Sequence, residues 1–112
     1  MMSKSQNTMN KNPRSAVRLP PVHPGEILKE TLEDFGLSMN RVAQEIRVPA
    51  NRISAIIAGQ RSITGETALR LGRYFGTTPA YWMNMQARYD LETARDEWEA
   101  RIQSDVRPRN VA

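Results

Sequence analysis

Residues 42–59 read VAQEIRVPANRISAIIAG, and their pattern indicates how the chain folds. Its apolar residues recur at helical spacing on both sides of Val48-Pro49. Because a proline disrupts a helix interior but suits a helix start, this pair predicts a corner. One helix is expected to end near Ile46 or Arg47, and the next is expected to cover about 50–58, with Gly59 ending it.

The spacing around this corner predicts a helix-turn-helix over about 38–58. Ala43 is a small residue on the first helix, which allows two axes to cross closely, and Ile53 completes the same interface ten residues later. Arg47 occupies the position at which the chain usually turns through a left-handed conformation favoured by glycine. A bulky residue there costs on the order of 1 kcal/mol, which packing on both sides can offset. The Arg47 side chain is expected to point outward, into solvent or towards a phosphate.

The rest of the chain predicts further helices and no strand. His23-Pro24 starts a helix, with proline at its first position, and Ser38, Thr64 and Thr78 are suitable N-cap residues for later ones. No strand-like alternation of useful length is present. The predicted fold is therefore all-α with five helices, over about 24–35, 39–47, 50–58, 65–75 and 79–104.

The length and composition predict one domain with two tails. The chain has 112 residues, of which 39% are hydrophobic, enough for one modest core. Residues 1–22 hold four cations and no acid and are rich in polar residues, which predicts a basic disordered tail. This tail could wrap DNA, touch a partner protein or do neither. The domain is expected over about 23–95, the long last helix over 79–104 and a frayed end over 105–112.

The charge is unevenly distributed along the chain. Residues 38–61 hold four arginines against one acid, Glu45, whereas the segments 24–36 and 79–105 are net acidic. A basic segment between acidic ones is typical of a polyanion-binding face. The alternative is an ordinary solvated surface on a chain whose net charge is +4.

The composition argues against several function classes. With no cysteine and a single histidine, the chain offers no thiolate, no disulfide and no ligand cluster for a metal ion. His23 stands at a helix start, where capping is expected rather than catalysis, and no phosphate-binding glycine loop is present. We therefore expect no enzyme, no cofactor, no metal and no small-molecule substrate. Without a long apolar run or a signal segment, a cytoplasmic protein that spans no membrane is expected.

At the level of motifs, the chain resembles a known family. The stretch LSMNRVAQEIRVPANRISAIIAGQRSIT resembles the helix-turn-helix of the Cro/cI (XRE) family. More narrowly, HPGEIL, VPANRIS, GQRSIT and TALRLGRYFGTTPAYWMNMQARYDLE resemble the HigA/VapI antitoxins of type II toxin–antitoxin modules. The likeness covers about residues 22–95 and implies a lambda-repressor-like DNA-binding domain. The chain departs from the family pattern at Arg47, which replaces the usual turn glycine, and in its basic tail.

The resemblance also implies which residues would meet DNA. The helix after the corner resembles the recognition helix, which enters the major groove with its N-terminal residues. The expected base contacts are Ala50, Asn51, Arg52, Ser54 and Ala55. Asn51 suits adenine, Arg52 suits guanine and Ala50 suits a thymine methyl. The expected phosphate contacts are Ser38, Asn40 and Arg41 at the start of the preceding helix, and Gln60, Arg61 and Ser62 in the following loop. For Asn51, Arg52, Arg41 and Arg61 the alternative is a solvated side chain.

The last predicted helix carries two apolar faces. Trp82, Met85 and Tyr89 share one side and are expected to dock on the other helices. The opposite stripe comprises Met83, Ala87, Leu91, Ala94, Trp98 and Ile102. A small monomer has no core left to bury this stripe, so it predicts an interface. The simplest partner is a second copy, giving a two-fold dimer that binds a palindromic operator; the alternatives are a toxin-docking surface and disorder beyond Arg95.

Two functions remain open. The resemblance implies a DNA-binding antitoxin that represses its own toxin–antitoxin operon and neutralises a cognate RelE-like, HigB-type toxin. The residues themselves support only the DNA-binding half. The alternative is a stand-alone XRE-type repressor with no toxin partner, and a short basic reading frame beside this one would discriminate between them.

Overall fold

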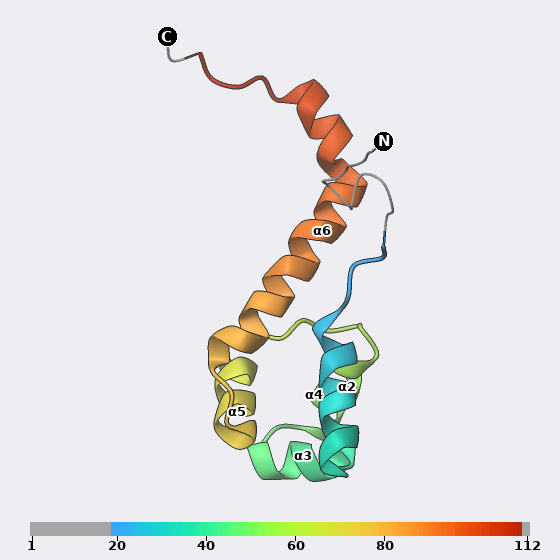
Figure 1. Cartoon of the computed structure of the whole chain (residues 1–112), viewed down its shortest axis with the longest axis vertical. Helices are drawn as coiled ribbons and strands as arrows, with labels where there is room; N and C mark the ends of the chain where they lie inside the picture. The colour runs from blue at the N-terminus through green and yellow to red at the C-terminus, as the bar shows by residue number, and fades with distance from the viewer. Residues whose placement is uncertain (1–18, 111–112) are drawn as a thin grey trace, which may run out of the picture.

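The computed structural model describes residues 19–110, so the predictions for residues 1–18 and 111–112 lie outside the described residues. Within 19–110 the chain forms five helices and no strand (Figure 1). They are α2 (Pro24–Phe35), α3 (Met39–Ile46), α4 (Ala50–Ile57), α5 (Gly65–Phe75) and α6 (Pro79–Asp105). The predicted all-α fold with a long C-terminal helix is confirmed, and each helix starts at the expected position.

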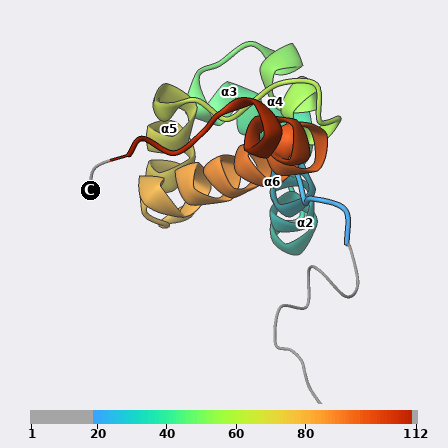
Figure 2. The same cartoon turned by 90° about the horizontal axis from the view of Figure 1, so that it is seen from above.

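The helices α2 to α5 form one packed unit, and α6 extends beyond it. Figure 1 shows α6 beginning beside α5 and rising past the other helices, with residues 106–110 continuing away from them. Seen from above, α6 runs from α5 across to α2 (Figure 2). The first half of α6 thus closes the domain, whereas its second half projects from it.

One hydrophobic core joins all five helices. The predicted interface of the helix-turn-helix is buried, with Ala43 from α3 and Ile53 from α4 at its centre. Trp82 is fully buried, and its indole N–H donates to the Thr77 hydroxyl at 2.8 Å. The core residues are Leu28, Leu32, Val42, Ala43, Ile46, Ile53, Ile56, Ile63, Ala68, Leu71 and Trp82. The docking role predicted for Trp82 is therefore confirmed, and Met85 packs partly buried beside this core.

The helix starts are capped as the sequence predicts. The Nδ1 atom of His23 accepts a hydrogen bond of 2.9 Å from the Gly25 N–H, so the histidine caps α2. Ser38 accepts from the Arg41 N–H at 3.0 Å, and Thr78 accepts from the Tyr81 N–H at 3.1 Å. These bonds satisfy N–H groups that a helix start otherwise leaves without a partner.

The corner between α3 and α4 has the predicted left-handed conformation. Arg47 has φ 66° and ψ 48°, and it is the one non-glycine residue with positive φ among the described residues. The Val48 N–H donates to the Ala43 carbonyl at 3.0 Å, which closes the end of α3. Arg47 is exposed, so the strain of its backbone is not accompanied by burial of its charge.

Gly25 determines how closely α2 and α4 approach. A Cβ atom at this position would lie 1.9 Å from the carbonyl oxygen of Ile56. Since that oxygen belongs to the backbone of α4, no side-chain rotation can relieve the clash. A residue without a side chain is therefore required where α2 supports α4.

Two large apolar residues, one on α2 and one on α5, lie outside the core. Phe35, the last residue of α2, is 60% exposed, and its ring packs on that of Phe75 with 5.3 Å between centroids. Leu69 is 62% exposed, because it faces away from the side of α5 that carries Ala68 and Leu71.

Candidate nucleic-acid interface

The N-terminal part of α4 presents a polar surface on a rigid base. Ala50, Asn51 and Ser54 are exposed, whereas Ile53 and Ile56 on the other side of the helix are buried. The Ser54 hydroxyl donates to the Asn51 carbonyl at 3.3 Å, and Ala55 is half-buried. Pro49 precedes the helix without a side-chain capping bond, so the first amides of α4 are not capped by a side chain.

Arg52 lies differently from the other predicted base contacts. Its side chain is only 17% exposed, and its Nη1 atom lies 3.3 Å from Oε1 of Glu66 on α5. Its Nε atom is buried without a hydrogen-bond partner among the described residues. The structure thus directs Arg52 towards α5 and Asn51 towards solvent, although the two are adjacent in sequence.

The start of α3 brings the predicted phosphate contacts Ser38, Asn40 and Arg41 together on an exposed surface. The Arg41 Nε donates to the Glu45 carboxylate at 2.6 Å. The Tyr74 hydroxyl of α5 also donates to Glu45. Hydrogen bonds from Tyr74 and then from Arg41 lower the pKa of the Glu45 carboxyl below its ordinary value.

The predicted contacts of the loop after α4 are exposed and their loop is anchored. Gln60, Arg61 and Ser62 lie at the surface. The next residue, Ile63, is buried, and its N–H donates to Oε1 of Gln86 on α6 at 2.7 Å. Gln86 also donates to Asp90 at 2.9 Å, so the buried amide is satisfied on both sides. The loop is therefore held in position by α6.

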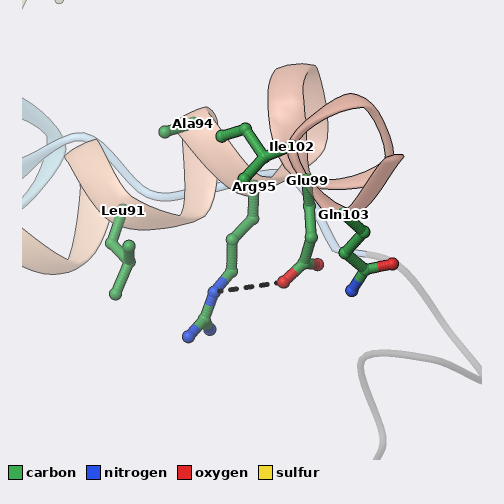
Figure 3. Close-up of a pocket in the computed structure, with 6 residues that line it drawn as sticks. All are labelled: Leu91, Ala94, Arg95, Glu99, Ile102 and Gln103. Atoms are coloured by element: carbon green, nitrogen blue, oxygen red, sulfur yellow. Dashed lines mark ion pairs between the residues drawn. The ribbon is translucent and has the colours of Figure 1, made fainter. Parts of the chain in front are cut away.

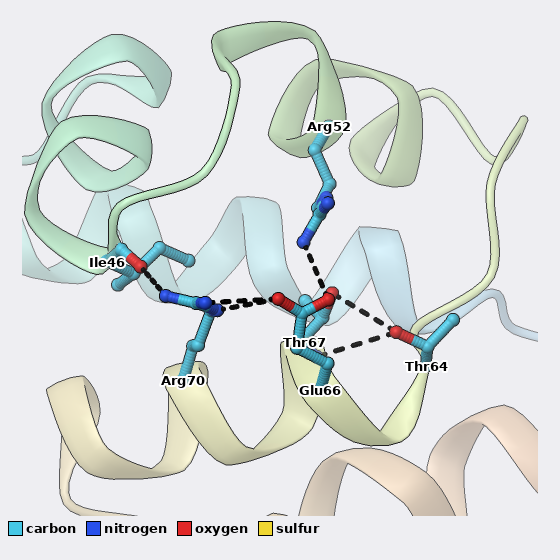
Figure 4. A network of polar contacts seen from close by, with 6 residues as sticks. All are labelled: Ile46, Arg52, Thr64, Glu66, Thr67 and Arg70. Atoms are coloured by element: carbon cyan, nitrogen blue, oxygen red, sulfur yellow. Dashed lines mark hydrogen bonds and ion pairs between the residues drawn. The ribbon is translucent and has the colours of Figure 1, made fainter.

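A network of charged groups connects α3, α4 and α5 (Figure 4). Arg70 on α5 donates to the carbonyl of Ile46, the last residue of α3, at 2.8 Å. It also contacts Oε2 of Glu66 at 3.0 Å, while Oε1 of Glu66 faces Arg52. Hydrogen bonding from Arg70, followed by the charge of Arg52, lowers the pKa of the Glu66 carboxyl below its ordinary value.

Sequence reasoning missed Glu66, Arg70 and Gln86 as residues that position this surface. The pair Glu66 and Arg70 has a visible signal, because opposite charges four residues apart stabilise a helix. Their contacts with Arg52 and Ile46 have no such signal, because those partners lie 14 and 24 residues away. Gln86 resembles any other polar residue until the fold places it beside Ile63.

The second stripe of α6 lies uncovered in the single chain. Trp98 is 44% and Ile102 is 51% exposed, and Met83, Ala87, Leu91 and Ala94 are exposed as well. Figure 3 shows a groove on this part of α6, lined by Leu91, Ala94, Arg95, Glu99, Ile102 and Gln103. Arg95 and Glu99 form a long ion pair of 4.0 Å beside it. The structure therefore places an apolar groove with a charged edge on the projecting half of α6.

Residues 19–110 contain neither a membrane-spanning helix nor a cluster of metal-binding side chains. No helix there has the length and apolarity needed to cross a membrane. No group of three or more metal-binding side chains is present in the same range.

Comparison with known proteins shows which family the chain is similar to. The family model described as Helix-turn-helix matches residues 28–82. Virulence-associated protein I of Dichelobacter nodosus is 45% identical over 86 residues, which cover 76% of this chain and 80% of that protein. Its family is one of DNA-binding regulators and antitoxins rather than of enzymes.

Two solved structures share the fold closely. An addiction module antidote protein of a HigA family from Coxiella burnetii has a TM-score of 0.79 and 44% identity, covering 81% of this chain and all of that one (100%). The Pseudomonas aeruginosa antitoxin HigA, solved with the higBA promoter, has a TM-score of 0.76 and 40% identity, covering 79% and 97% of the two chains.

Proposed function

The chain belongs to the HigA/VapI family of XRE-type helix-turn-helix proteins, and from this membership we propose that it is a sequence-specific DNA-binding antitoxin. In this role it represses its own toxin–antitoxin operon and neutralises a HigB-type, RelE-like toxin by direct contact. The observation that carries the DNA-binding half is the exposed polar surface at the start of α4, held by a buried apolar face.

Base recognition is assigned to side chains in the first two turns of α4, of which Ala50, Asn51 and Ser54 are exposed. Asn51 can donate to and accept from an adenine edge, and Ala50 can contact a thymine methyl group. Ser54 and Ala55 follow on the next turn of the helix. Arg52 belongs to the same set by sequence, but to reach a base it must leave the carboxylate of Glu66.

Phosphate contacts are assigned to both ends of the helix-turn-helix. Ser38 caps α3, and Asn40 and Arg41 lie in its first turn, where the helix dipole also favours a negative group. Gln60, Arg61 and Ser62 follow α4 in the loop that Gln86 anchors. Such contacts position the protein on a duplex and carry no sequence information of their own.

A homodimer is assigned to the uncovered stripe of α6. Exposed large apolar residues on a projecting helix are typical of an interface. A two-fold dimer would present two copies of α4 to the half-sites of a palindromic operator, about one helical turn apart.

The toxin is the less direct part of the proposal and rests on the family. The P. aeruginosa relative is named an antitoxin, and that name supports a protein partner for this chain as well. A stand-alone repressor would use the same surface of α4 without a toxin. Co-purification with the product of a neighbouring reading frame supports the antitoxin, and a solitary repressor gene supports the alternative.

DNA reading is tested with two variants that should behave differently. Asn51→Ala is expected to lower the affinity for the upstream region of its own gene about tenfold and to leave the affinity for unrelated DNA nearly unchanged. Arg61→Ala is expected to lower both affinities alike and to reduce the slope of log K against log salt by about one unit. Fluorescence anisotropy at several salt concentrations measures both. Equal loss on both DNAs from Asn51→Ala would contradict the assignment of α4.

A further inference from the structure

Glu66 lies between two arginines of different helices (Figure 4). Its Oε1 atom lies 3.3 Å from Nη1 of Arg52 on α4, and its Oε2 atom lies 3.0 Å from Nη2 of Arg70 on its own helix, α5. Arg70 continues the chain of contacts to the carbonyl of Ile46 at the end of α3. One carboxylate on α5 is therefore linked to both helices of the helix-turn-helix.

The two ends of the Arg52 contact have very different exposure. The Glu66 side chain is 56% exposed, whereas the Arg52 side chain is only 17% exposed. The guanidinium is thus packed between helices with its charge facing the carboxylate. Its Nε atom has no hydrogen-bond partner among the described residues, and within residues 19–110 Glu66 is the carboxylate that pairs with this guanidinium.

We propose that Glu66 is a positioning residue that determines the specificity of DNA binding. It retains Arg52 against α5, where Arg52 supports α4 instead of contacting DNA. Base reading is then left to the exposed neighbours Asn51 and Ala50. The inference rests on the proposed DNA-binding function and changes the role of Arg52 within it, from a base contact to a support.

Retaining Arg52 favours specific binding because a mobile cation does not distinguish one DNA sequence from another. A long arginine side chain released near a recognition helix can contact the phosphates of any duplex, whatever its sequence. Pairing with Glu66 neutralises that charge and fixes the side chain. The carboxylate thereby lowers the affinity for unrelated DNA more than the affinity for the operator.

The test compares Glu66→Gln with the unmodified protein on operator and unrelated DNA. Release of Arg52 is expected to raise the affinity for unrelated DNA several-fold and to steepen the salt slope by about one unit. The ratio of the two affinities is expected to fall. Glu66→Asp keeps the carboxylate and is expected to restore the unmodified slope and ratio.

The matched control separates release of Arg52 from simple loss of a negative charge. Glu66→Gln in an Arg52→Met background removes the same charge, but no guanidinium is present to be released. The methionine keeps an apolar stem in the packed position. The steeper slope should therefore disappear in the double variant, and its persistence there would overturn the proposal.

A second measurement does not depend on the folding of Glu66→Gln. Arg52→Met alone is expected to keep the ratio of operator to unrelated affinity within about twofold. A loss of about tenfold that maps to one base pair of the operator would show that Arg52 reads a base, and the role of Glu66 would be wrong. If the unmodified protein showed no operator preference, the proposed function itself would fall, whereas the other negative results concern Glu66 alone.

Discussion

Arg47 shows how a single residue adapts to a conformation that its side chain disfavours. It takes a left-handed backbone at the corner between α3 and α4, although the family pattern has glycine there. The hydrogen bond from the Val48 N–H to the Ala43 carbonyl spans Arg47 and stabilises this corner. Ala43 and Ile53 are buried against each other across the corner, and the free energy of this packing offsets the backbone strain at Arg47.

Arg47→Gly is expected to raise the free energy of unfolding by up to about 1 kcal/mol. Glycine removes the left-handed strain, and its greater freedom in the unfolded chain offsets part of the gain. Urea unfolding followed by circular dichroism measures the change. Arg47→Ala keeps a Cβ atom at the same φ and serves as the control, with little stability gained. A less stable Arg47→Gly variant would contradict the strain argument.

For single residues, the sequence predicts the backbone conformation better than it predicts the direction of the side chain. The conformation of Arg47 follows from its spacing from Ala43, which is local information. The direction of Arg52 does not, because its partner Glu66 is 14 residues away on another helix. The sequence predicts the same role, a base contact, for Asn51 and Arg52. Their side chains point in different directions because α5 packs beside Arg52.

At the scale of elements, two carboxylates connect α5 to the helix-turn-helix. Glu66 is linked to α4 through Arg52, and Glu45 on α3 accepts from Tyr74 on α5. Both carboxyls have a pKa below the ordinary value, because each is stabilised in its charged form. Their contribution to folding is complete above the unfolded pKa of about 4.5 and is lost as the pH falls through the lowered folded value.

The packing of α5 is therefore expected to weaken in acid. The free energy of unfolding should fall between pH 5 and pH 3, and the double variant Glu45→Gln, Glu66→Gln should lose less over the same interval. Urea titrations at several pH values measure both slopes. Equal slopes for the two proteins would show that other carboxyls cause the acid sensitivity.

The elements themselves were predictable because their ends are local. Proline at the first position of α2 and α6, and hydroxyl caps before α3, α5 and α6, mark starts within a few residues. The exposure of Phe35 and Leu69 could not be predicted, because the apolar character of a residue does not specify which neighbour will cover it. The anchoring of the loop by Gln86 likewise depends on the tertiary arrangement.

For the whole molecule, the projecting half of α6 carries an apolar stripe that the domain leaves uncovered. Its periodicity predicted an apolar stripe away from the domain, and the structure leaves that stripe exposed. The identity of its partner does not follow from one chain, because a copy and a toxin both could cover an apolar helix. Arg95 and Glu99 form a charged edge beside this stripe.

Trp98→Ala is expected to convert a dimer into a monomer in sedimentation equilibrium. The change removes the largest apolar side chain of the stripe, and its effect on the isolated domain should be small because Trp98 is 44% exposed. Operator affinity should fall at the same time, because the two half-sites would be bound separately. Glu97→Ala, an exposed residue of α6 that is not part of the stripe, is the control. An unchanged mass for Trp98→Ala would place the dimer interface elsewhere.

The contrast between the two tryptophans supplies an internal pair of optical reporters. Trp82 is sealed in the core and its emission should move to longer wavelength only when the chain unfolds, whereas Trp98 already meets water and lies 6.0 Å from the Arg101 guanidinium. Covering of α6 by any protein should shift the Trp98 emission to shorter wavelength and shield it from iodide. Assembly and unfolding would therefore change the fluorescence in opposite directions, without a dye attached to the chain.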